Sequence, residues 1–63
     1  MNKEIEFYTV QDLQRILHIG KSKSYVLCKQ RLFPTIKIGS KTLIYKEEFN
    51  QWLRENENNH IRI

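Results

Sequence analysis

Residues 9–31 read TVQDLQRILHIGKSKSYVLCKQR, and this stretch decides the fold. Its first part places apolar side chains at Val10, Leu13 and Leu17, at a spacing of three and then four residues. This spacing puts the three side chains on one face of a helix and is typical of a short amphipathic helix. We therefore expect a helix over residues 10–17.

The two ends of this helix carry their own signals. Thr9 precedes it and Asp12 lies three residues further on, which is the pattern of an N-terminal capping box. Gly20 interrupts the apolar pattern, permits a tight turn and can cap a second helix from residue 21 to about residue 31. Two short helices joined by a tight turn predict a helix-turn-helix motif.

The second helix has a buried and an outward side. Its periodicity places Ser24, Leu27, Cys28 and the stem of Arg31 on the inner side. The candidate DNA contacts at its start and on its outward side are Lys21, Ser22, Lys23, Tyr25, Val26 and Lys29. Lysines suit phosphates, hydroxyl groups suit base edges or phosphates, and a valine suits a thymine methyl group.

A β-hairpin follows the second helix. Pro34 favours an extended chain, and residues 35–38 alternate with period two. Gly39 and Ser40 form the kind of two-residue turn that closes a hairpin, and residues 41–45 return as its second strand. The candidate DNA contacts on this wing are Lys37, Ser40, Lys41 and Thr42.

A third helix is expected after the hairpin. Glu47 and Glu48 are favourable near a helix N-terminus, and Phe49, Trp52 and Leu53 then form an apolar face. We expect this helix to close the core. The order of elements predicts a small α+β fold, a winged helix-turn-helix.

Size and composition limit what the chain can do. Its 63 residues suit one small domain over residues 1–55, followed by a polar, flexible tail over residues 56–63. Cys28 is the only cysteine and is expected to be a small core residue, without a disulfide or zinc site. No apolar run is long enough to span a membrane, so we expect a cytoplasmic protein. No catalytic or cofactor-binding motif is present, which argues against an enzyme and against a small-molecule substrate.

The charge is sorted along the chain. The total is +4, but from Leu13 to Lys46 there are eight cationic side chains and no acidic ones, while each flank carries a net −2. The eight are Arg15, Lys21, Lys23, Lys29, Arg31, Lys37, Lys41 and Lys46. A basic helix followed by a basic hairpin favours double-stranded DNA as the partner. A solvated surface without a ligand is the alternative for such charges.

Four segments in order resemble the excisionase-type helix-turn-helix 17 domains, MerR-like winged helices of phages and mobile elements. They are residues 8–13 (YTVQDL), 17–25 (LHIGKSKSY), 33–39 (FPTIKIG) and 44–53 (IYKEEFNQWL). Four positions depart from the family pattern. Gly20 replaces the usual serine cap, and Leu43 stands where the second wing strand often has arginine. Ser24 stands where a core valine is usual, and Arg31 stands where the family has glycine.

The resemblance implies that the second helix lies in the major groove and the wing at the neighbouring minor groove or backbone. It also implies that such proteins bend attachment-site DNA, bind side by side with further copies, and contact an integrase to favour excision. Close relatives regulate transcription, which is the second hypothesis. A protein-interaction module whose basic face binds an acidic partner is the third.

Overall fold

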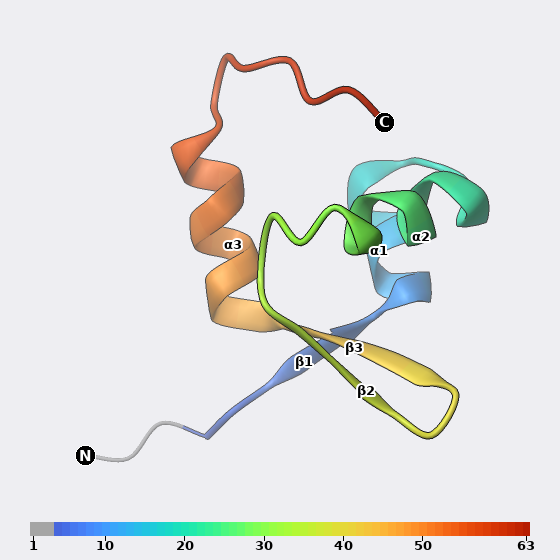
Figure 1. The fold of residues 1–63 in the computed structure, drawn as a ribbon. Coiled ribbons are helices and arrows are strands. Elements are labelled where there is room, and N and C mark those ends of the chain that lie inside the picture. The colour runs from blue at the N-terminus through green and yellow to red at the C-terminus, as the bar shows by residue number, and fades with distance from the viewer. Residues whose placement is uncertain (1–3) are drawn as a thin grey trace.

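Six elements make up the fold of residues 4–63, the part of the chain that the computed structural model describes. In chain order they are β1 (Phe7–Thr9), α1 (Val10–Leu17), α2 (Lys21–Lys29), β2 (Thr35–Ile38), β3 (Lys41–Tyr45) and α3 (Lys46–Glu55). The helices α1 and α2 lie side by side, α3 stands apart from them, and the hairpin β2–β3 projects beyond all three (Figure 1). This arrangement confirms the predicted α+β winged helix-turn-helix.

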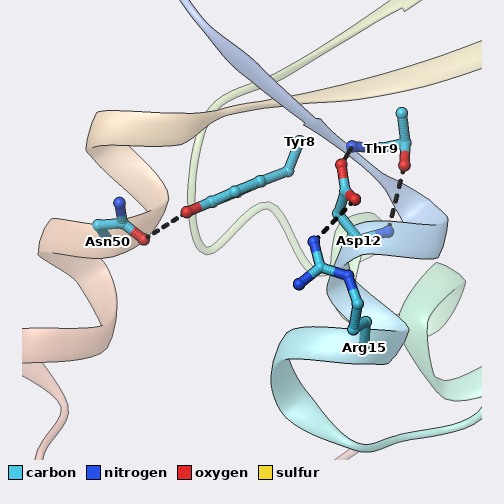
Figure 2. Close-up of polar contacts among 5 residues, drawn as sticks. All are labelled: Tyr8, Thr9, Asp12, Arg15 and Asn50. Carbon is cyan, nitrogen blue, oxygen red and sulfur yellow. Dashed lines mark hydrogen bonds and ion pairs between the residues drawn. The ribbon is translucent and has the colours of Figure 1, made fainter.

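The first helix begins at the predicted capping box. The Thr9 side chain accepts a hydrogen bond from the Asp12 backbone amide, and the Asp12 carboxylate accepts one from the Thr9 amide (Figure 2). The hydrogen bond from the Thr9 amide, reinforced by Arg15, lowers the pKa of Asp12 below its usual range. The helix ends at His18, which has a left-handed φ of 56°.

The second helix begins after Gly20, as predicted, and ends two residues earlier than predicted. Ser24 is fully buried, and its hydroxyl group donates to the Gly20 carbonyl at 2.9 Å, so this polar side chain is satisfied in the core. Gln30 caps the C-terminus, and Arg31 takes a left-handed φ of 57°. The expected burial of the Arg31 stem is therefore wrong, because the chain leaves the helix before this residue and Arg31 is exposed.

The sheet has the strand order β1-β3-β2, and both neighbouring pairs are antiparallel. The hairpin turn falls at Gly39 and Ser40, as predicted, and Gly39 has a φ of 61°, where an L-residue would be strained. The hydrophobic pattern did not indicate β1, which is only three residues long. This strand pairs with β3 and makes the predicted hairpin part of a three-stranded sheet.

The two faces of the sheet differ. Paired residues share a face, so Tyr8 lies beside Ile44, which is completely buried, on the inner face. Ile36 pairs with Leu43 on the outer face. Ile36 and Ile38 are 37% and 60% exposed, so the apolar side of strand β2 does not contribute to the core.

The core lies between the inner face of the sheet and the three helices. Its buried apolar residues are Val10, Leu13, Leu27, Cys28, Phe33, Ile44 and Phe49. The rings of Phe33 and Phe49 pack edge to face at 4.8 Å, and Trp52 covers them from α3. Cys28 is a core residue, as predicted, and burial raises the pKa of its thiol.

The C-terminal segment passes from α3 back towards α2 (Figure 1). Ile61 packs against the core, and the Gln30 side-chain amide donates to the Arg62 carbonyl at 3.3 Å. The mobility of residues 56–63 stays a prediction. No helix within residues 4–63 is long and apolar enough to cross a membrane.

Candidate nucleic-acid interface

We call the hairpin β2–β3 the wing. An open groove of about 660 Å³ lies between the first two helices and the tip of the wing. Its lining residues are Thr9, Val10, Gln11, Gln14, Lys21, Tyr25, Ser40, Lys41 and Thr42. They come from α1 with its cap, from α2 and from the wing, so only the folded chain forms this groove. The lining contains two lysines, several polar groups and no acidic side chain. Such a surface suits an anionic ligand rich in hydrogen-bond acceptors.

The second helix presents separate sides to the core, the groove and the solvent. Ser24, Leu27 and Cys28 are buried. Lys21 and Tyr25, which lie one turn apart, line the groove. The other predicted residues of this helix, all exposed, are Ser22, Lys23, Val26 and Lys29. The predicted exposure of Tyr25 is confirmed, since 39% of this residue is accessible.

The wing contributes Ser40, Lys41 and Thr42 to the groove. Lys37 is exposed and does not line it. Lys37 stands directly opposite Thr42 in the hairpin, however, so both side chains leave the sheet on the same face. The structure therefore brings five of the ten predicted contact residues into one groove and leaves the other five exposed on the same two elements. Their contact with DNA stays a prediction.

Two groove residues were missed by the sequence reasoning. Gln11 and Gln14 of α1 line the groove together with residues of the wing. They are uncharged, so a search for basic side chains passes over them. The signal that was available is their spacing of three residues, which places both on one side of the helix, beside rather than within its apolar face.

Arg15 and Lys46, which belong to the acid-free run, are held in ion pairs within the described residues 4–63. Arg15 lies 3.0 Å from Asp12, and Lys46 lies 3.0 Å from Glu6. The hydrogen bond that the Lys46 ammonium group donates to Glu6 raises the pKa of Lys46, and this ammonium group also lies 5.4 Å from the centre of the Tyr8 ring. The remaining six, all exposed, are Lys21, Lys23, Lys29, Arg31, Lys37 and Lys41. Positive charge is thus concentrated on α2, the residues after it and the wing.

Negative charge gathers elsewhere on the sheet. A smaller hollow of about 160 Å³ is lined by Glu4, Ile5, Glu6, Tyr45, Glu47 and Glu48. None of these residues lines the groove, and Tyr45 is at the end of β3 opposite the wing tip. A polyanion is repelled at this end and attracted at the other, which orients its approach.

A helix-turn-helix followed by a β-hairpin wing and a closing helix defines the winged helix-turn-helix class, whose second helix is the recognition helix in DNA complexes. The model of the helix-turn-helix domain family (helix-turn-helix 17) matches residues 7–57. The chain belongs to this family and is a DNA-binding helix-turn-helix domain. No curated protein and no solved structure matches the chain.

Proposed function

We propose that the protein is an excisionase, a recombination directionality factor that binds and bends attachment-site DNA and assists an integrase. It acts as a monomeric cytoplasmic protein that performs no catalysis, and further copies bind neighbouring sites. The family supports the DNA-binding part of this proposal. The resemblance of four segments to excisionase-type domains supports the role in recombination.

In the proposed complex α2 lies in the major groove and the wing lies at the adjacent minor groove. Ser22, Val26 and Lys29 face the base edges, because they are exposed on the side of α2 opposite its buried residues. Lysines at the start of α2 bind phosphates, near the free amides of its first turn. On the wing, Lys37 and Lys41 bind the backbone, and Ser40 and Thr42 add hydrogen bonds.

One observation carries this proposal. The recognition helix and the wing, which are separate in sequence, share a single groove with no acidic side chain in its lining. If the basic side chains only formed a solvated surface, nothing would require the recognition helix and the wing to line the same groove. A protein-interaction module would also present a basic face, so the ligand has to be tested directly.

The first test is binding of the purified protein to duplex DNA at increasing salt, followed by fluorescence anisotropy. If about six cations neutralise phosphates, log K should fall against log salt with a slope of roughly −5. If the protein does not bind duplex DNA even at low salt, or if its affinity does not change with salt, the result contradicts the proposal and favours the protein-interaction module.

The second test separates recombination from transcription. An integrase encoded next to this protein should bind attachment-site DNA cooperatively with it, and circular-permutation assays should show a bend in that DNA. Independent binding of the two proteins, together with tight binding to a promoter, favours the transcriptional regulator of the same fold.

A further inference from the structure

The groove between α2 and the wing has a third side, which comes from α1. Gln11 and Gln14 lie on this side, and their side-chain amides are uncharged hydrogen-bond donors. Gln11 is exposed and Gln14 is half-buried. Within residues 4–63, neither side-chain amide donates a hydrogen bond to another group of the protein. These donors face a groove that the two lysines make positive.

The geometry of duplex DNA decides what must enter this groove. A major groove and the minor groove beside it are separated by one sugar-phosphate backbone. A protein that places a helix in the first and a hairpin in the second must therefore accommodate that backbone between the two. Here the space between α2 and the wing is the groove itself. This step rests on the proposed function.

The acidic residue that follows Gln11 in sequence does not oppose a phosphate in the groove. Asp12 lies next to Gln11, but its carboxylate accepts from the Thr9 amide at 2.9 Å and from Arg15 at 3.0 Å (Figure 2). Its negative charge is thus paired on α1, and Asp12 does not line the groove. The side of α1 towards the groove offers donors without a competing anion.

We propose that Gln11 and Gln14 bind the phosphodiester backbone that separates the major from the minor groove. The two amides donate to phosphate oxygens while Lys21 and Lys41 supply the charge on either side. The first helix therefore fixes the depth at which α2 and the wing engage the duplex. This contact is independent of sequence, because phosphates are the same at every step.

The test compares Gln11→Ala and the double variant with Gln14→Ala against the full-length wild-type protein on the same duplexes. A hydrogen bond to a charged group predicts a loss of about tenfold in affinity for Gln11→Ala. The salt slope should stay that of the wild type, because a neutral donor releases no counterion. The ranking of affinities across a set of duplex sequences should also stay unchanged. Gln51→Ala on α3, outside the groove, is the matched control and should bind as the wild type does.

Gln11→Glu provides a second variant that keeps the fold. An acidic residue in the first turn of a helix is favourable, so its thermal melt should match or exceed the wild type. Its affinity should fall by on the order of a hundredfold at low salt and recover partly as salt screens the repulsion.

The outcomes separate this inference from the proposed function. Wild-type protein that fails to bind duplex DNA overturns both. Wild-type binding that Gln11→Ala and Gln11→Glu leave unchanged overturns only the inference. A variant that changes the ranking of sequences shows that Gln11 contacts base edges and overturns the backbone assignment.

Discussion

Thr9 and Asp12 cap the first helix reciprocally: the Asp12 amide donates to Thr9 Oγ1 at 3.1 Å, and the Thr9 amide donates to Asp12 Oδ2 at 2.9 Å (Figure 2). Thr9 is also the last residue of β1 and pairs with Leu43 of β3. The pair therefore fixes the direction in which α1 leaves the sheet. Because Gln11 follows within the same turn, the cap also sets the side of the groove that α1 forms.

The capping box makes stability depend on pH in a defined direction. The pKa of Asp12 is lowered in the folded state from its ordinary value of 3.8, so the folded chain favours the carboxylate. A depressed pKa contributes stability above the ordinary value, and this contribution is lost as the pH falls through the folded value. We expect the wild type to lose stability below about pH 4 relative to Asp12→Asn, which lacks this titration.

Urea unfolding of the wild type and Asp12→Asn between pH 2.5 and 6 measures the difference in their free energies of unfolding. The contributions of the other carboxylates, which both proteins share, cancel in this difference. Thr9→Ala is a companion variant and should lose about 1 kcal/mol at neutral pH, the usual effect of removing an N-cap. A difference between wild type and Asp12→Asn that stays constant over the whole range contradicts the role of the Asp12 carboxylate.

Arg31 is strained, and Arg31→Gly should relieve the strain. Its φ of 57° is left-handed, which costs an L-residue about 1–2 kcal/mol. Glycine removes this cost but gains about 0.4–1 kcal/mol of entropy in the unfolded chain. We expect the free energy of unfolding to rise by about 0.5–1 kcal/mol, measured by urea denaturation at pH 7. The family pattern, which has glycine at this position, points the same way.

Gly39→Ala is the opposite substitution and serves as the control. Gly39 has a φ of 61°, and a Cβ atom there would meet nothing within 4 Å, so only the backbone is affected. This variant should lose about 1 kcal/mol. If Arg31→Gly and Gly39→Ala shift stability in the same direction, backbone strain does not govern these two positions.

The parts of the fold that depend on local signals were predictable. The capping box at Thr9 and the turn at Gly39 involve residues close in sequence, and the structure has both where the pattern places them. The strand β1 was not predictable, because Phe7–Thr9 is too short for a periodic signal and exists only through pairing with a strand more than thirty residues away.

The candidate site was predictable only in part for the same reason. A helical projection gives Lys21 and Tyr25 an exposed position, but only the folded chain places them beside Lys41. The projection failed at Arg31, where the backbone had already left the helix. The projection also gave no weight to Gln11, because this residue is uncharged. Its proposed role depends on Lys21 of α2 and Lys41 of the wing, which line the same groove.

Lys41→Ala should weaken DNA binding through charge alone. Lys41 is exposed at the wing tip and lines the groove, so its removal should leave the thermal melt unchanged. Loss of one phosphate contact should make the slope of log K against log salt shallower by about one unit. Arg54→Ala removes the same charge from α3, outside the groove, and should leave the slope unchanged. Equal slopes for Lys41→Ala and the wild type remove Lys41 from the interface.

Two neighbouring residues of α2 separate folding from binding. Leu27 is only 3% exposed, whereas Val26 is 42% exposed on the outward side. Leu27→Asp buries an unpaired charge in a domain of this size, whose total stability is about 3–9 kcal/mol, and should unfold it at 25 °C. Val26→Asp should change stability by no more than about 0.5 kcal/mol, because Val26 is exposed and does not belong to the core. It should nevertheless lower DNA affinity by at least about tenfold, since it places a negative charge against the duplex.

Circular dichroism melts and anisotropy titrations of both variants measure the two effects. If Val26→Asp folds and binds DNA like the wild type, this side of α2 does not face the duplex. If Leu27→Asp melts like the wild type, α2 packs on the core through another side.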